Sequence, residues 1–326
     1  MDGQVRDALE AAARASLRAP SVFNTQPWSW RVDGRFMELR GDRTRRLAVT
    51  DPESRLLLLS CGTALHHARV ALAAAGWTAD VERLPDARQP DVLARIRMTG
   101  RGDADPFAVR LADAIIRRRT DRRAYGERRV PPQTLTRLAF LVEAEGAHLH
   151  VVPDERVPEL AVAVDEAADV EYFDPAYRGE LNRWTHRPAW TGDGVPPSTA
   201  VRPSLRRVPA RNHLPGGTAG LPAGPGGDEG AVYAVLHGHD SSPLHLLRGG
   251  EALSAVLLYA TDQQISTCPS SEAVEVPWPR RLLRRLLADA GEPYLIVRLG
   301  YVDSGAAPPP SPRRPARETV ELTGWQ

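Results

Sequence analysis

The connection between Ala19 and Trp28 constrains this chain more than any other stretch of its sequence. It joins an alanine-rich helical pattern over residues 2–18 to a strand pattern in which Trp28 and Trp30 alternate with polar neighbours. Pro20 ends the helix, and hydroxyl and amide side chains follow it closely. Such groups can hydrogen-bond the edge of a planar heterocycle, and the tryptophan strand would give that ligand a rigid wall. We therefore expect a ligand site here rather than a plain turn.

The overall composition excludes several classes of function. The chain has 326 residues, of which 42% are hydrophobic, so it can bury a full core. Its 42 basic and 41 acidic residues nearly cancel, which leaves no net field to attract nucleic acid or an anionic membrane. All 42 basic residues are arginines, and the lack of lysine excludes Schiff-base chemistry and a Walker-type phosphate loop.

The cysteines and the hydropathy pattern bear on the compartment. Cys61 and Cys268 lie far apart and outside any CxxC pattern, so neither a disulfide framework nor a zinc site is indicated. Neither a signal peptide nor a membrane span is visible. We expect a cytoplasmic protein with no nucleic-acid and no membrane partner.

Helix and strand patterns alternate along most of the chain. Helices are expected over residues 2–18, 106–119, 132–145, 157–172, 176–184, 246–263 and 279–289, together with a long buried helix opened by a capping box at Thr50–Glu53 and ended by Gly76. Strands are expected over residues 28–32, 36–39, 78–84, 92–98, 148–152, 231–236 and 294–301. Segment 187–230 breaks the pattern, which indicates a lid, a flexible arm or disorder, and the tail over 306–317 is expected to be extended.

Two short runs repeat at corresponding places in the pattern. Gly62–Leu65 reads GTAL and Gly250–Leu253 reads GEAL, each within a long apolar helix. This echo indicates a duplicated unit, and two such units would bury their long helices against each other as a symmetric dimer does.

The histidines and the arginine-rich run were weighed as ligand sites. Histidines pair at His66 and His67, at His148 and His150, and at His237, His239 and His245, but no carboxylate or cysteine accompanies them at ligand spacing, so no metal is expected. Five arginines and Thr120 fill Arg117–Arg123, which fits either a solvated charge run or a phosphate cradle. Motifs for acyl transfer, zinc hydrolysis and a Rossmann site are missing from the sequence.

Taken together, these motifs resemble the FMN-dependent nitroreductase superfamily. Ala19–Trp28 is similar to the APSxxNxQPW signature, and Arg118–Arg122 resembles the RRSxR phosphate signature with threonine for serine. The helix from Gly250 leads into Ile265–Pro269, which resembles the family's flavin loop, and Pro312–Pro315 resembles its late basic element. The two main signatures occur in reverse order and far apart, which resembles the Acg-like branch, where one chain mimics the usual dimer and a lid covers the site.

The resemblance implies an α+β, internally duplicated fold with a first unit over residues 1–104 and a second over 105–326, which includes the lid at 187–230. It implies one FMN per chain at the junction of the units, hydride transfer at flavin N5 without a catalytic side chain, and NAD(P)H as a candidate donor to a small-molecule substrate. The chain would be a monomer acting as a pseudo-dimer, or a homodimer. The residues implied for FMN are Pro20, Ser21, Asn24, Arg118, Arg119, Thr120, Arg122, Pro269, Ser270, Arg313 and Arg314.

Three departures from the family pattern leave other functions open. Serines and Glu272 follow Pro269 where the family has a glycine that lets backbone approach the flavin. Gln264 stands where the first long helix has Gly76, and a closed lid would exclude NAD(P)H and large substrates. An occluded protein that sequesters FMN and a flavin-free scaffold are therefore the alternatives.

Overall fold

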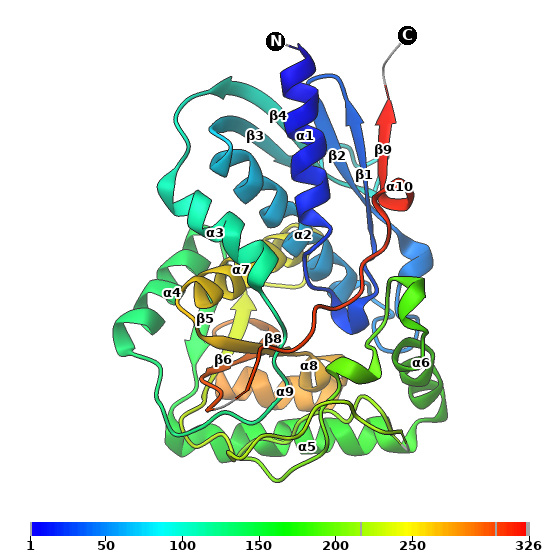
Figure 1. Cartoon of the computed structure of the whole chain (residues 1–326). Helices are drawn as coiled ribbons and strands as arrows, with labels where there is room; N and C mark the ends of the chain where they lie inside the picture. Colours follow the sequence, from blue (N-terminus) through cyan, green and yellow to red (C-terminus); the bar gives the residue numbers. More distant parts are fainter. Residues whose placement is uncertain (1, 216, 304, 324–326) are drawn as a thin grey trace.

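The computed structural model of the chain describes residues 2–215, 217–303 and 305–323, and it has two β-sheets with two long helices between them (Figure 1). Sheet A has the order β3-β4-β2-β1-β9, and sheet B has the order β5-β6-β8-β7. Within both sheets every strand pair is antiparallel except β1 with β9. The strands are β1 (Trp28–Asp33), β2 (Phe36–Gly41), β3 (Trp77–Arg83), β4 (Val92–Arg101), β5 (His148–Val151), β6 (Val232–Gly238), β7 (Ser266–Ser270), β8 (Glu292–Gly300) and β9 (Val320–Thr323).

The helices cover the sheets and fill the space between them. The two central helices, α2 and α7, pack more extensively against each other than any other two elements. The helices are α1 (Asp2–Ser16), α2 (Arg55–Ala74), α3 (Pro106–Arg117), α4 (Pro132–Ala144), α5 (Val157–Phe173), α6 (Pro175–Thr185), α7 (Pro243–Asp262), α8 (Glu272–Glu275), α9 (Pro277–Leu286) and α10 (Ala316–Thr319). These elements confirm the expected α+β class and the packing of the two long apolar helices.

The hydrophobic residues form one core beneath each sheet. Trp28 and Trp30 lie in the core of sheet A, where α1 and α2 cover them, because they alternate with outward-facing neighbours along β1. The expectation that this strand forms a wall of the ligand site is wrong, since neither tryptophan lines the cavity described below. The core of sheet B is formed by the almost fully buried strands β6 and β8 with α5, α7 and α9.

The long helix α2 begins later than the capping box predicts. Its first residue is Arg55, and Ser54 precedes it in the left-handed region with φ 61°. Asp51 caps the helix in place of Thr50, because its Oδ2 accepts a hydrogen bond from the backbone N–H of Leu57 at 2.9 Å. By length and composition α2 passes the test for a membrane span, but 78% of that window is buried inside the fold, as in a core helix.

Four elements in the C-terminal part of the chain were not expected from the sequence. Strand β7 and the short helix α8 form where a loop was expected, and α10 and β9 follow the extended tail over 306–315. The chain therefore returns from sheet B to sheet A, where β9 pairs in parallel with β1 (Figure 1). The C-terminal strand of the region assigned to the second unit thus completes the sheet of the first.

Segment 187–230, called the cover segment below, has two short 3₁₀ turns and is otherwise irregular. It is attached to the body at several points. The carbonyl of Gly194 accepts from Asn24 Nδ2 at 3.0 Å, and the buried Asp228 accepts from Tyr125 N at 2.7 Å and from Arg298 Nη1 at 2.6 Å. These contacts hold the cover segment against the rest of the fold.

Candidate functional site

A cavity of about 250 Å³ is lined by residues from 20–63 and from 120–298, and its volume is close to the size range of small-ligand pockets. Its walls come from the loop after α1, the side of α2, strand β7, the inner strands of sheet B and the cover segment. Six of the expected cofactor residues line it, namely Pro20, Ser21, Thr120, Arg122, Pro269 and Ser270. The other five, Asn24, Arg118, Arg119, Arg313 and Arg314, lie outside its lining.

The loop after α1 has a strained backbone. Phe23, Asn24 and Gln26 all have φ between 49° and 53°, although none is glycine. Internal hydrogen bonds hold this conformation, because Ser21 Oγ accepts from Gln26 N at 2.9 Å. Thr63 of α2 anchors the loop by donating its hydroxyl to Pro20 O at 2.7 Å. Strain of this kind persists where the surrounding structure fixes it and is frequent at ligand sites.

The amides of the loop hold the cover segment and the C-terminal tail. Asn24 Nδ2 donates to Gly194 O and to Pro312 O, both at 3.0 Å, and Asn24 Oδ1 accepts from Arg313. Gln26 Nε2 donates to Gly192 O at 2.8 Å. Both polar atoms of the Asn24 amide are therefore engaged within the chain. The expected role of Asn24 in binding the flavin stays a prediction.

Arg118 is the most unusual residue of the arginine-rich run. It is 6% exposed, and its Nε and Nη1 have no hydrogen-bond partner among the described residues. Burial, and after it the charges of Arg119 and Arg122, lowers the pKa of its guanidinium to about 10. A buried cation without a partner is costly unless an anion binds to it. This observation favours the phosphate cradle over the solvated charge run.

Arg313 brings the C-terminal tail to the same place. Burial, together with the charges of Arg118, Arg18 and Arg119, lowers the pKa of the Arg313 guanidinium to about 9. Its Nη2 donates to the carbonyl of Arg18 at 2.9 Å. Four arginines from three separate segments therefore share one region, which we call the arginine cluster: Arg18, Arg118, Arg119 and Arg313. Burial, and after it the charges of Arg118 and Arg313, lowers the pKa of His67, and its Nε2 has no partner among the described residues.

Strand β7 connects the arginine cluster to the cavity. Asp121 N donates to Thr267 O at 2.9 Å, so the chain just after Arg119 runs beside β7. Pro269 and Ser270, the next residues of β7, line the cavity. The cluster and the cavity are thus held together by adjacent stretches of backbone, as one elongated site requires.

Arg122 and Arg314 make their hydrogen bonds outside the arginine cluster. Arg122 lines the cavity and donates to Thr199 O of the cover segment at 3.3 Å. Arg314 instead supports the first unit, because its backbone N–H donates to Gln26 Oε1 at 2.9 Å and its side chain lies 3.8 Å from Asp42. The structure therefore favours Arg313 over Arg314 as the late arginine at the cluster.

Several cavity residues escaped the sequence analysis. Arg206 donates to Arg122 O at 2.7 Å, and burial, followed by the charge of Arg298, lowers its pKa. Arg298 of β8 is paired with the buried Asp228. Tyr233, Cys268, Arg202 and Arg211 also line the cavity. No local motif marks these residues, although the arginine content of the cover segment was a signal that pointed to an anionic ligand.

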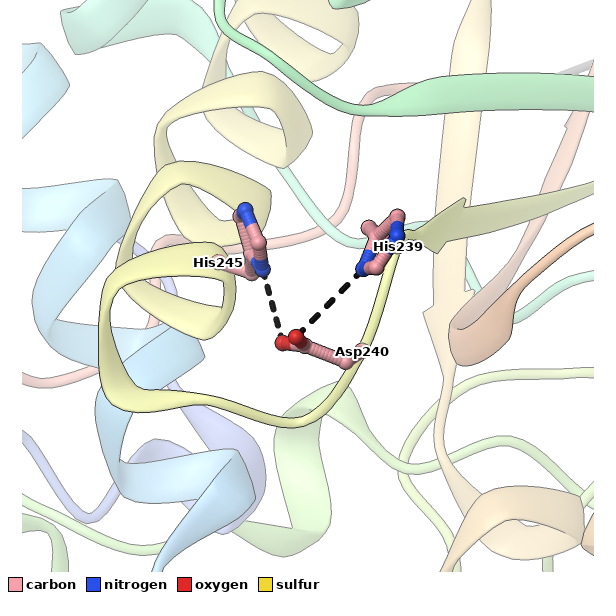
Figure 2. A group of neighbouring side chains, drawn as sticks. All are labelled: His239, Asp240 and His245. Atoms are coloured by element: carbon pink, nitrogen blue, oxygen red, sulfur yellow. Dashed lines mark hydrogen bonds and ion pairs between the residues drawn. The ribbon is translucent and has the colours of Figure 1, made fainter.

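One histidine group differs from the expectation. His239, Asp240 and His245 converge at the loop between β6 and α7, with His245 Nδ1 2.7 Å and His239 Nδ1 3.4 Å from the carboxylate (Figure 2). The statement that no carboxylate accompanies these histidines is therefore wrong. Asp240 Oδ1 also accepts from Ser242 N at 2.7 Å, so the group stabilises the first turn of α7. None of the three residues lines the cavity.

Comparison with known proteins identifies full-length relatives. No family model matches the chain. It is 37% identical over 322 residues to "Putative NAD(P)H nitroreductase Rv3131" of Mycobacterium tuberculosis, covering 94% of this chain and 89% of the relative. It is 36% identical over 323 residues to "Putative NAD(P)H nitroreductase acg" of the same organism, covering 97% and 96%. A third relative there, the uncharacterized protein Rv3127, is 32% identical over 96% of this chain and 93% of its own length.

Solved structures match more weakly. The FMN-dependent nitroreductase NfnB of Mycobacterium smegmatis, in complex with NADPH, covers 67% of this chain and 99% of its own, with 17% identity and a TM-score of 0.41. An FMN-bound nitroreductase of Bacteroides fragilis covers 60% and 90%, with 16% identity and a TM-score of 0.36. Superposition at this level is partial, and the sequence relatives carry the assignment.

Proposed function

Because the chain belongs to the nitroreductase family, in the branch that includes the mycobacterial acg relative, we propose that it is an FMN-dependent oxidoreductase acting on a small molecule. NAD(P)H is the candidate electron donor. FMN bound in the cavity would supply hydride transfer, and the chain's own residues would bind and orient it and shield it from water. The free thiols of Cys61 and Cys268 fit a cytoplasmic location.

The unpaired guanidinium of Arg118 is the observation that carries this proposal. Arg118, Arg119 and Arg313 offer several hydrogen-bond donors to one anion. Burial and the charges of neighbouring arginines lower the pKa values of Arg118 and Arg313. A phosphate in the cluster would offset that repulsion through charge-assisted hydrogen bonds. Thr120 continues from the cluster to the cavity wall, where Pro20, Ser21 and Ser270 would meet the ring.

We propose one FMN per chain, bound between duplicated units over residues 1–104 and 105–326. In the register set by the packing of α2 on α7, Glu251 of α7 corresponds to Thr63, which lines the cavity. Glu251 is fully buried and binds Arg69 at 2.7 Å and Arg83 at 2.6 Å. The place of a second, symmetry-related site is therefore filled by ion pairs, so the chain would act as a monomeric pseudo-dimer.

The cover segment favours the alternative of an occluded FMN-binding protein. Its residues from Val201 to His213 supply much of the cavity wall, so a donor reaches the ring only when this segment moves. An FMN-sequestering protein and an enzyme would differ in whether the cover segment moves within the time of a catalytic cycle.

The test is to purify the full chain, measure its bound flavin and follow NAD(P)H oxidation with a nitroaromatic or quinone acceptor. We expect one FMN per chain and acceptor-dependent oxidation. Bound FMN that stays oxidised under excess NAD(P)H would support sequestration. A colourless protein that cannot be reconstituted with FMN would exclude both and leave the flavin-free scaffold.

A further inference from the structure

The side chain of Arg211 in the cover segment lies in a small pocket formed by other parts of the chain, which we call the receptor. Its side chain is 5% exposed, and its Nη2 donates to Glu171 Oε1 at 2.8 Å and to Glu275 Oε2 at 2.6 Å. Glu272 Oε1 lies 3.7 Å from its Nε and accepts from its backbone N–H at 3.1 Å. The glutamates belong to α5 and α8, so the body supplies every anion and the cover segment supplies only the cation.

Two aromatic rings complete the receptor. The guanidinium carbon of Arg211 lies 5.0 Å from the ring centre of Phe23 and 5.7 Å from that of Tyr177. The Tyr177 hydroxyl also donates to Glu275 Oε2 at 3.4 Å. A planar cation is held by carboxylates at its edge and by aromatic faces, which is the arrangement found here.

The receptor contains more carboxyl groups than Arg211 alone can pair with as ions. Three carboxylates surround one guanidinium, where a single carboxylate suffices for a buried ion pair. Burial, together with the charges of Glu275 and Glu272, raises the pKa of Glu171 to about 8 although Arg211 opposes them, so Glu171 keeps a proton at neutral pH. Without Arg211 the same pocket would attract any planar cation that fits it.

The receptor also opens onto the cavity. Both Arg211 and Glu272 line it, and Ser270 of β7 donates its hydroxyl to Glu272 Oε2. A ligand cation in place of Arg211 would therefore lie beside the strand expected to pass the cofactor ring. Its arrival would displace a buried side chain that ties this part of the cover segment to α5 and α8.

We propose that Glu171, Glu272 and Glu275, with Phe23 and Tyr177, form a binding site for the guanidinium or amidinium group of a small-molecule ligand, and that Arg211 occupies this site when the cover segment is closed. This gives the proposed oxidoreductase a substrate class, and only the identification of the ligand as substrate rests on that proposed function. Binding requires neither FMN nor turnover.

Calorimetric titration with benzamidine, and with its neutral analogue benzamide, tests the site. Arg211→Ala should bind benzamidine at least about tenfold more tightly than the unaltered chain does, because Arg211 no longer competes, and should not bind benzamide. Arg207→Ala is the matched control, since Arg207 lies on the same segment but pairs with Asp154 at the surface. Adding Glu275→Gln to Arg211→Ala should abolish the gain. Equal benzamidine affinity in Arg211→Ala and the unaltered chain, or a gain that survives Glu275→Gln, overturns the proposal.

A second measurement uses the unaltered chain and so does not depend on the folding of a variant. Hydrogen exchange of residues 210–213 should become faster in methylguanidinium chloride than in tetramethylammonium chloride at equal ionic strength, because methylguanidinium competes with Arg211. Equal exchange in the two salts contradicts the proposal. Both readouts remain valid if the chain proves to lack flavin or turnover, so failure of the site and failure of the oxidoreductase assignment are distinguishable.

Discussion

Gly62 of α2 and Gly250 of α7 face each other where the two central helices cross. A Cβ added at either glycine would meet the other's Cα at 2.8 Å, and would also meet the carbonyl oxygen of Leu247 or Leu59 on the opposite helix. One turn further along, His66 Nδ1 lies 2.8 Å from Ser254 Oγ. Gly62 and Gly250 are separated in the sequence by the same number of residues as His66 and Ser254. Each helix thus meets the other through equivalent residues, as across the two-fold axis of a homodimer.

Gly62→Ala and Gly250→Ala should each destabilise the fold by about 3 kcal/mol, at the upper end of overpacking, because backbone on the opposite helix cannot yield as a side chain does. Urea unfolding measures this loss. The matched control is Gly3→Ala in α1, where an added Cβ meets nothing within 4 Å and the helix propensity rises. Losses no larger than that of the control would show that the two helices are not locked by this contact.

The central helices also show how far the sequence predicts the fold. Their glycines lie within runs of similar sequence, so their mutual packing could be expected. Strand β7 could not be expected, because Pro269 has no backbone N–H to donate within a sheet and is typical of a loop. The proline is tolerated because β7 is an edge strand of sheet B. The short β9 has too little pattern of its own and becomes a strand only by pairing with β1.

The candidate site was predictable where its residues are contiguous. Arg118, Arg119 and Thr120 share one run, and the loop from Pro20 to Gln26 forms another. The receptor around Arg211 draws on residues from four segments with no spacing that links them, so only the folded structure brings them together.

Replacing Arg118 by methionine should separate the effect of its unpaired charge on stability from its contribution to FMN binding. Without FMN, Arg118→Met should keep the free energy of unfolding or raise it by on the order of 1 kcal/mol, because a buried charge without a partner is removed. With FMN, the affinity should fall about tenfold or more, because charge-assisted hydrogen bonds to the phosphate are lost. Arg119→Ala should also weaken retention of FMN. Arg117→Met is the control, since Arg117 pairs with Asp113 in solvent. Equal FMN affinity in Arg118→Met and Arg117→Met would refute the placement of the phosphate.

Cys268 should report on occupancy of the cavity. It lines the cavity, whereas Cys61 is fully buried and its pKa is raised by burial. Iodoacetamide should therefore modify Cys268 alone, and saturation with FMN should slow the reaction. Peptide mass spectrometry locates the modified residue, and Cys268→Ser supplies the blank. Alkylation that proceeds at the same rate with and without FMN would mean that the flavin binds elsewhere.

Stability should fall between pH 7 and pH 8 because of Glu171. Its pKa is raised from an ordinary value of 4.5 to about 8 by burial, so in this window the folded chain holds a proton that the unfolded chain has released. Raising the pH therefore favours unfolding, with a slope of at most about 1.4 kcal/mol per pH unit. Buried histidines such as His66, with a pKa lowered to about 3, act in the opposite sense, but their effect ends once the unfolded histidines are neutral near pH 7.

The variant Glu171→Gln mimics the protonated carboxyl at every pH and keeps its shape. Urea unfolding of this variant should give the same free energy at pH 7 and pH 8, while the unaltered chain loses stability. Glu159→Gln, on the same helix but in solvent beside Arg156, should behave as the unaltered chain does, because its lowered pKa leaves it ionised throughout this window. A slope that persists in Glu171→Gln would show that Glu171 is not the group that holds this proton.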